Sequence, residues 1–205
     1  MPTLSELPIG AILAGGRATR MGVDKALVRF EGRPMIEHVA SAIVAAGYEP
    51  LVVGRESAPG GLEAVPDDVG TTQGPAGGLA TALRIAGGRP VILVATDQPL
   101  LRPETLRALL RLDGIAVVPV DLKTRQTTCS IYRSDMAEPL LALMANHPRP
   151  SLQRLLNGVS VREVPPTEWR QWGEDGRSWR SLDTPDAVTE AERWLRATEG
   201  AQAQD

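Results

Sequence analysis

The sequence predicts an α/β fold, a single-domain three-layer α/β/α arrangement around a mostly parallel sheet. The chain has 205 residues, the size of one domain that can bury an apolar core. Short apolar runs typical of strands alternate with segments whose apolar residues recur at helical spacing. The run Val91–Ala95 is apolar on both faces, as a central strand covered by helices should be. We treat residues 1–205 as one domain and expect loose tails at 1–7 and 197–205.

The first elements are a strand, a helix and a second strand. Ile9–Ala14 is a continuous apolar run that ends at two glycines, as a buried strand does. Pro34 suits the first turn of a helix, whose apolar residues recur every three or four positions until Gly47 ends it. Leu51–Val53 forms the next strand.

The middle of the chain continues the alternation. Ala76–Ala86 carries leucines one turn apart and is followed by two glycines, which predicts a helix. The central strand Val91–Ala95 comes next. Pro103 then opens a helix with three leucines on one face, and Ile115–Val120 follows as a strand.

The last part of the chain adds two strands and two helices. Thr127–Tyr132 and Val159–Val164 are the expected strands, and Met136–Ala145 is a helix between them. The final helix begins at Thr184 and Pro185, because threonine is a favoured N-cap and proline suits the first turn of a helix.

The segment Pro165–Arg180 contains two adjacent prolines and three of the four tryptophans, Trp169, Trp172 and Trp179, without any period. We interpret it as a loop or flap whose indoles cover an edge of the core. The alternative is that the indoles shield or stack on a bound ligand.

Charge and cysteine content limit the partners and the compartment. The net charge is −3, from 22 Lys and Arg against 25 Asp and Glu, so no global positive field attracts nucleic acid or an anionic membrane. The single cysteine, Cys129, cannot form an internal disulfide. The apolar runs are too short for a membrane span, and the N-terminus does not resemble a secretory signal. We therefore expect a cytoplasmic protein.

A glycine-rich segment follows the first strand. Gly15 and Gly16 let the backbone approach a ligand closely, and their N–H groups can cradle phosphate oxygens. Arg17, Arg20 and Lys25 add up to three cations, which suits a triphosphate. The alternative is a glycine turn with solvated charges.

Known phosphate-binding fingerprints do not fit this segment. The glycine spacing differs from G-x-G-x-x-G, and Lys25 is not part of a Gly-Lys-Ser/Thr motif. These mismatches argue against a nicotinamide enzyme and a P-loop ATPase. The two histidines, His38 and His147, lack a second ligand at helical spacing, so we interpret them as structural or solvated.

Asp97 lies just beyond the strand Val91–Ala95, at the edge where ligands bind in open α/β sheets. If this strand neighbours Ile9–Ala14, Asp97 approaches Gly15. A lone carboxylate there suits Mg²⁺, which takes one or two protein carboxylates together with substrate phosphates and water. The alternative role for Asp97 is a helix or turn cap.

Two further acids and a helix entry belong to the same hypothesis. Asp183 directly precedes the last helix. It is either a second metal ligand or an acid that the helix dipole favours at this position. Asp67 follows a short strand and can accept hydrogen bonds from guanine N–H groups or a ribose hydroxyl. Gly74 and Pro75 open a helix whose N-terminus can face an anion or a base, although alone they are only a glycine-rich helix entry.

Several short motifs occur in the order found in a known family. They are Leu13-Ala14-Gly15-Gly16, Arg20-Met21-Gly22, Asp24-Lys25, Gln73-Gly74-Pro75, Asp97-x-Pro99 and Asp183-Thr184-Pro185. Over residues 9–195 the chain resembles the molybdenum cofactor guanylyltransferases of the nucleotidyltransferase superfamily. The resemblance implies a Rossmann-like nucleotidyltransferase fold. It also implies transfer of GMP from Mg-GTP to the terminal phosphate of molybdopterin, giving molybdopterin guanine dinucleotide and pyrophosphate.

The resemblance also implies site residues. The residues implied to bind GTP are Leu13, Ala14, Gly15, Gly16, Lys25, Asp67, Gly74, Pro75 and Asp97. The residues implied in catalysis are Arg20, Lys25 and Asp97, and Arg20 would offset charge on the departing pyrophosphate. Asp97 and Asp183 would bind the implied cofactor, Mg²⁺. The sequence departs from some members at Gly54, where they have Asn, and at Asp183, which replaces a frequent Asn.

The acceptor and the competing functions stay open. Arg125, Gln126, Ser151 and Arg154 are candidate contacts for the anionic pterin, and the Trp169–Trp179 segment is a candidate cover for it. Transient contacts with other molybdenum cofactor proteins are a further expectation. Transfer of CMP, or of a nucleotide to another phosphorylated acceptor, is the nearest alternative; cytidylyl-transferring relatives usually carry Ala at the position of Gly15, which favours GTP. A non-catalytic nucleotide-binding regulator is the alternative from another class.

Overall fold

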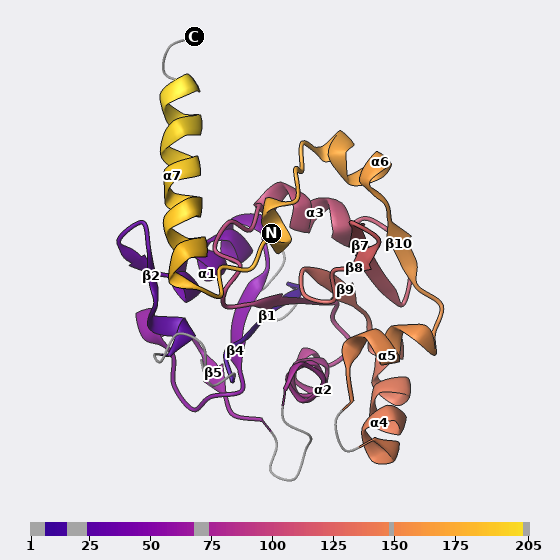
Figure 1. The fold of residues 1–205 in the computed structure, drawn as a ribbon. Coiled ribbons are helices and arrows are strands. Elements are labelled where there is room, and N and C mark those ends of the chain that lie inside the picture. Colours follow the sequence, from indigo (N-terminus) through magenta and orange to yellow (C-terminus); the bar gives the residue numbers. More distant parts are fainter. Residues whose placement is uncertain (1–6, 16–23, 68–73, 148–149, 203–205) are drawn as a thin grey trace.

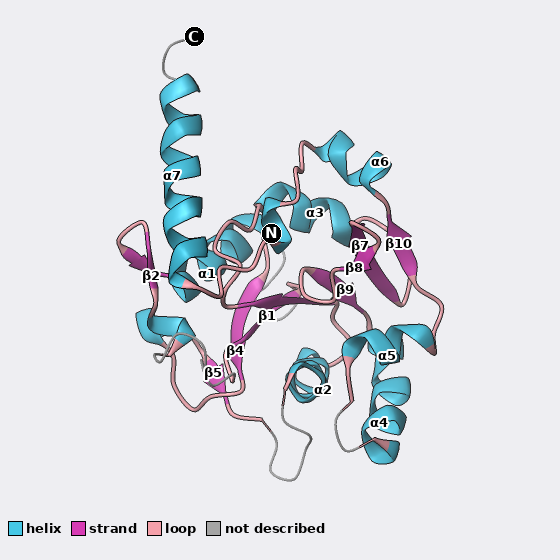
Figure 2. Ribbon diagram, in the orientation of Figure 1, coloured by secondary structure: helices cyan, strands magenta, loops and turns pink. Residues whose placement is uncertain are grey.

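Figure 1 shows a computed structural model that describes residues 7–15, 24–67, 74–147 and 150–202. One sheet lies between two layers of helices, which confirms the predicted three-layer α/β/α fold (Figure 2). The strand order is β10-β7-β9-β6-β1-β4-β5, with the short β8 paired to β7. These strands are β1 (Ile9–Leu13), β4 (Glu49–Val53), β5 (Ala64–Val65), β6 (Val91–Ala95), β7 (Ala116–Asp121), β8 (Thr124–Arg125), β9 (Ser130–Tyr132) and β10 (Arg162–Val164).

Most neighbouring strands of the sheet run parallel. β1 pairs in parallel with both β4 and β6. Within the described part of this sheet, only β8 and β9 pair antiparallel with their neighbours. Leu13 stands opposite Ala95 in the β1–β6 register, so these two strands end at the same edge. The chain moves from β1 to β4 on one side and later returns to β6 on the other. The edge beside β1 is therefore a topological switch point, where ligands bind in open α/β sheets.

Helices cover both faces of the sheet. α1 (Met35–Ala46) and α3 (Pro103–Leu110) cover one face, and α2 (Pro75–Ala86), α4 (Ala137–Asn146) and α5 (Leu152–Asn157) cover the other. Alternate residues of each strand enter opposite cores, as a pleated strand requires. In β6, Ile92 and Val94 pack with α1 and α3, whereas Val91 and Leu93 pack with α2. This confirms the prediction that Val91–Ala95 is a central strand.

The C-terminal helix α7 (Pro185–Gln202) is anchored outside these layers. Val188 and Ala191 pack with Phe30 and Leu182 in a small separate cluster. Phe30 belongs to a two-stranded hairpin of β2 (Arg29–Phe30) and β3 (Arg33–Pro34). From this anchor the helix projects away from the body of the molecule (Figure 1). It continues past Arg196, where the loose tail was expected to begin, as far as Gln202.

The tryptophan segment contains regular structure that the sequence did not predict. It forms α6 (Pro166–Trp169) and two 3-10 turns over Arg170–Trp172 and Arg177–Trp179. Trp169 and Trp179 are buried and meet edge to face with ring centroids 5.1 Å apart. Their indole N–H groups donate to Val120 O and Asp121 Oδ2, each at 3.1 Å. The interpretation that these indoles cover a core edge is confirmed, but the segment is not an irregular loop, because helices this short leave no detectable period.

Other boundaries also differ from the prediction. The strand expected from Thr127 starts only at Ser130, because Cys129 has a positive φ of 68° that breaks the extended backbone. The strand expected from Val159 starts at Arg162. Helix α5 is not predicted from the sequence; its first turn is capped by the Ser151 hydroxyl, which accepts from the Arg154 N–H. Among the described residues, no helix is both long and apolar enough to cross a membrane.

Candidate active site

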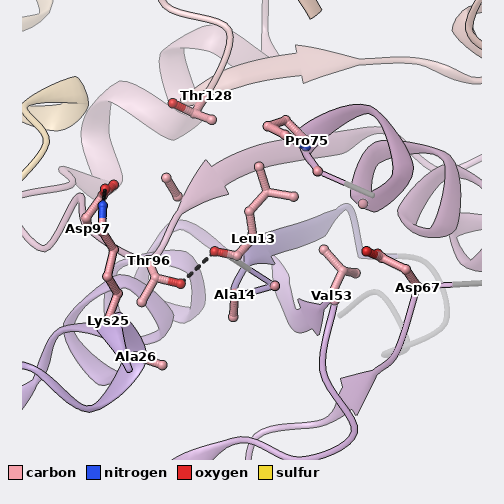
Figure 3. Close-up of a pocket in the computed structure, with 15 residues that line it drawn as sticks. Leu13, Ala14, Lys25, Ala26, Val53, Asp67, Pro75, Thr96, Asp97 and Thr128 are labelled. Atoms are coloured by element: carbon pink, nitrogen blue, oxygen red, sulfur yellow. Dashed lines mark hydrogen bonds and ion pairs between the residues drawn. The ribbon is translucent and has the colours of Figure 1, made fainter. Parts of the chain in front are cut away.

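A cavity of about 300 Å³ opens at the carboxyl ends of β1, β4, β5 and β6 (Figure 3). It lies at the switch point and is walled by residues from both halves of the parallel sheet. The lining residues are Leu13, Ala14, Gly15, Lys25, Ala26, Val53, Gly54, Asp67, Gly74, Pro75, Gly78, Ala95, Thr96, Asp97 and Thr128. Asp97 and Asp67 lie on opposite sides of this cavity.

Glycines form the floor of the cavity because the backbones there come too close for side chains. A Cβ on Gly54 would lie 2.9 Å from both the N and Cα atoms of Gly15, and Gly54 itself has a φ of +91°. On α2, a Cβ at Gly78 would lie 2.4 Å from Leu13 Cδ2. Glycine tolerates the positive φ and the close contact, so the strand ends and α2 can meet closely.

The N-terminus of α2 faces into the cavity. Gly74 takes the N-cap position with a φ of 104° and a ψ of −168°, a conformation restricted to glycine. Pro75 occupies the first turn, where its missing N–H costs no helical hydrogen bond. Exposed N–H groups and the positive end of the helix dipole make such a terminus suited to an anion or to the polar edge of a base.

Lys25 and Asp97 form an ion pair at the opposite side of the cavity. Lys25 Nζ lies 2.8 Å from Asp97 Oδ2 (Figure 3). The Asp97 side chain is only 14% exposed and that of Lys25 is 29% exposed, so the pair is partly shielded from water. The two residues are 72 positions apart, so the fold must bring them together.

The turn that carries Asp97 is fixed by hydrogen bonds on both sides. The Thr96 hydroxyl donates to Leu13 O at 2.6 Å, which ties the end of β6 to the end of β1. The buried side chain of Gln98 accepts from Ala95 N at 2.9 Å and donates to Thr128 Oγ1 at 3.0 Å. The Leu182 N–H donates to Asp97 O at 2.7 Å. These contacts hold the Asp97 backbone and leave its carboxylate directed at the cavity.

The Lys25 backbone is held by a separate set of contacts. Lys25 begins a 3-10 turn, Lys25–Leu27, whose N-cap Asp24 accepts from the Ala26 N–H at 3.0 Å. Arg55, which follows β4, donates to both carboxylate oxygens of Asp24 at 3.3 and 2.9 Å. The Asp24–Arg55 pair therefore fixes the backbone from which the Lys25 side chain extends.

Replacing Asp24 with alanine should weaken nucleotide binding by about threefold, because it removes a cap and an ion pair that each contribute roughly 0.5–1 kcal/mol. The Lys25 backbone then loses its support while its side chain is unchanged. Isothermal titration with a nucleoside triphosphate measures the effect. The matched control is Asp186→Ala, an exposed acid in the first turn of α7. Equal affinity of Asp24→Ala and wild type would contradict this role.

The donor set at Asp97 fits a divalent ion that arrives with a substrate. A cation, the Lys25 ammonium, already lies against the partly buried carboxylate. Within the described parts of the chain, no group of three or more Asp, Glu, His or Cys side chains could enclose a metal. A single carboxylate is the pattern expected for Mg²⁺, which completes its octahedron with phosphates and water. Asp183 follows Leu182, which bonds Asp97 O, but it does not line the cavity.

The structure brings most of the expected nucleotide residues together. The cavity is lined by eight of them: Leu13, Ala14, Gly15, Lys25, Asp67, Gly74, Pro75 and Asp97. Gly16 and Arg20 lie outside the described residues, as does Arg17.

The expected pterin contacts do not line this cavity, and each has a partner elsewhere. Arg125 bonds Glu163 and Asn157, and Gln126 donates to Thr124 O. Ser151 caps α5 at Arg154, whose guanidinium contacts His147. Their role toward a pterin stays a prediction.

Sequence reasoning missed several residues of the cavity wall. Thr128 comes from the loop before the antiparallel strand β9, and Gly78 lies one turn inside α2. In the sequence, Gly54 stands out only as a departure from other family members. The Gly-Gly pair within Gly74–Gly78 was a usable signal, because glycine inside a helix costs about 1 kcal/mol and calls for a packing reason.

The fold and the cavity together define an α/β protein with a ligand site at the switch point of its sheet, lined by glycines, a helix N-terminus and a Lys–Asp pair. Comparison with known proteins identifies the family. The chain belongs to the MobA-like NTP transferase domain family, whose model matches residues 10–163. This family places the chain among the nucleotidyltransferases.

Individual relatives agree with this assignment. A molybdenum cofactor guanylyltransferase of Xanthomonas euvesicatoria pv. vesicatoria is 38% identical over 110 residues, which are 53% of this chain and 56% of that protein. A probable molybdenum cofactor guanylyltransferase of Trichormus variabilis is 32% identical over 169 residues, 74% of this chain and 77% of that protein.

Solved structures share the fold. Molybdopterin-guanine dinucleotide biosynthesis protein A from Archaeoglobus fulgidus superposes with a TM-score of 0.80 at 22% identity, covering 92% of this chain and 99% of that one. A Mycobacterium tuberculosis protein solved as a complex with manganese has a TM-score of 0.63 at 18% identity, covering 90% of this chain and 97% of its own. At these identities the likeness establishes the fold, and the predicted Rossmann-like nucleotidyltransferase fold is confirmed.

Proposed function

We propose that the protein transfers GMP from GTP to the terminal phosphate of molybdopterin and releases pyrophosphate. The observation that carries the proposal is the Lys25–Asp97 pair, 2.8 Å apart, at the side of a cavity with glycine walls. It combines a cation for phosphate with a carboxylate for a divalent metal. The names of the relatives supply the choice of guanylyl transfer and of the pterin acceptor.

The cavity supports a nucleotide lying across the ends of β1 and β4. Gly15 lines it without a side chain that would block a base or a phosphate, and the neighbouring lining residues Leu13 and Ala14 are apolar. Asp67 stands on the side away from Asp97, where its carboxylate can accept from guanine N–H groups or a ribose hydroxyl. The base then lies near Asp67 and the phosphates lie near Lys25.

The reaction needs positioning and charge neutralisation more than proton transfer. The acceptor phosphate oxygen is already anionic at neutral pH, so no general base is required. The acceptor oxygen forms a bond to the α-phosphorus of GTP while the bond from that phosphorus to the bridging oxygen breaks, and pyrophosphate leaves with that oxygen.

Several residues of this chain would together neutralise the negative charge of the triphosphate. Lys25 carries a fixed positive charge at the cavity, and Arg20 is proposed to lie by the pyrophosphate. Mg²⁺, when bound, would be held by Asp97 together with the phosphates and would offset their charge. Asp183 is a proposed second ligand. Arg125, Gln126, Ser151 and Arg154 remain the proposed pterin contacts.

Incubation with Mg²⁺, molybdopterin and each nucleoside triphosphate in turn tests the proposal. We expect pyrophosphate release with GTP and formation of molybdopterin guanine dinucleotide, detected by mass spectrometry, and neither product without the acceptor. Faster release with CTP would replace GMP transfer by CMP transfer. Nucleotide binding without any product would indicate a non-catalytic regulator.

A further inference from the structure

The Asp97 carboxylate has a cation directly against it. The Lys25 ammonium lies 2.8 Å from Asp97 Oδ2 in a pair that is mostly shielded from water. A divalent ion bound by Asp97 would either take the position of the ammonium or bind beside it. In the second case the two positive charges would repel each other. Partial burial strengthens that repulsion, because the effective dielectric constant is lower than in water.

The described residues offer little that would bind a free metal ion beside this pair. Among the described residues, no cluster of three potential metal-ligating acids, histidines or cysteines exists. The pair formed by Lys25 and Asp97 is neutral overall, so its carboxylate is already compensated. Mg²⁺ also dehydrates reluctantly and is normally held jointly by protein carboxylates and substrate phosphates.

Lys25 can leave Asp97 without any movement of the main chain. Its backbone is held by the Asp24 cap and, through Asp24, by Arg55. Its side chain is a flexible chain of four methylene groups, and among the described residues Asp97 is the one hydrogen-bond partner of its ammonium. Triphosphate oxygens in the cavity would offer the ammonium a stronger counter-charge than a single carboxylate does.

We propose that Lys25 occupies the cation position of Asp97 in the nucleotide-free protein and excludes free divalent metal until a triphosphate draws the ammonium away. Lys25 then neutralises phosphate and Asp97 becomes available to the metal that accompanies the nucleotide. Metal and nucleotide binding are therefore positively coupled, and the coupling passes through this one side chain. The inference rests on the proposed function only in that the cavity accepts a metal–triphosphate complex.

Mn²⁺ titration followed by electron paramagnetic resonance tests the proposal without turnover. In the absence of nucleotide, Lys25→Met should bind Mn²⁺ about tenfold more tightly than wild type, within the range usual for coupled ligands. Lys25→Arg keeps a cation and should bind Mn²⁺ as weakly as wild type. Lys123→Met is the matched control, because Lys123 is the only other lysine and lies on the β7–β8 turn. Asp97→Asn should abolish the gain when combined with Lys25→Met.

A second measurement uses the wild-type protein alone. The probe is a GTP analogue with a methylene group between the α- and β-phosphorus atoms. After correction for Mn²⁺ bound to free analogue, adding it should raise the affinity of the protein for Mn²⁺ by about tenfold. Lys25→Met should lose most of this coupling. Equal Mn²⁺ affinity of wild type and Lys25→Met would overturn the proposal, and so would equal coupling in both proteins.

The two proposals fail in different ways. If GMP transfer occurs but Lys25→Met gains no Mn²⁺ affinity, the function stands and the exchange is wrong. If the exchange is observed with the analogue but no molybdopterin guanine dinucleotide forms, the exchange stands and the assigned reaction is wrong.

Discussion

Asp97→Ala should lower the rate of pyrophosphate release by roughly a thousandfold, the scale of losing a group that directly organises transition-state charge. Asp97 is the only acid at its side of the cavity among the described lining residues. Its removal takes away the proposed metal ligand and also leaves the Lys25 ammonium without its partner. A steady-state assay of pyrophosphate release from GTP with molybdopterin measures the loss.

Two controls separate this catalytic effect from loss of structure. Asp113→Ala removes an exposed acid just beyond α3 and should leave both activity and stability unchanged. Asp97→Asn keeps the size of the side chain and should be nearly as inactive as Asp97→Ala. Thermal unfolding of the Asn variant should resemble wild type, because the Asp97 backbone is held independently by Leu182. Activity of Asp97→Ala within tenfold of wild type would refute the assigned role.

The sequence predicts the frame of this site well because the relevant signals are local. The apolar run Val91–Ala95 identifies a central strand from its own composition, and Asp97 follows within two residues. The glycines after β1 mark a place of close backbone approach without any tertiary information. Given a parallel sheet, these two ends must meet at the same edge, and the β1–β6 register confirms that they do.

The remaining features depend on contacts between distant elements. The Lys25–Asp97 pair joins residues 72 positions apart, and Thr128 reaches the cavity only because β9 enters the sheet antiparallel beside β6. The positive φ at Cys129 delays the start of the strand predicted from Thr127 until Ser130. Such conformations are set by packing, since a non-glycine residue with this φ is unfavourable on its own.

Gly54→Ala should reduce the free energy of unfolding by about 3 kcal/mol, combining left-handed backbone strain with a steric clash. A φ of +91° is unfavourable for alanine, and the new Cβ would lie 2.9 Å from the N and Cα atoms of Gly15. Backbone atoms cannot rotate away as a side chain can. β1 and the loop after β4 must therefore separate, which also opens the cavity and should weaken nucleotide binding. Urea denaturation and titration with GTP measure the two effects.

Gly47→Ala measures the part of this loss that comes from backbone strain alone. Gly47 ends α1 with a φ of +88°, close to that of Gly54, but nothing lies within 4 Å of its added Cβ. Its alanine variant should lose only about 1 kcal/mol and bind GTP normally. The difference between the two variants measures the cost of separating Gly54 from Gly15. If both variants lose equal stability, backbone strain alone explains Gly54, and the close approach contributes nothing to the shape of the site.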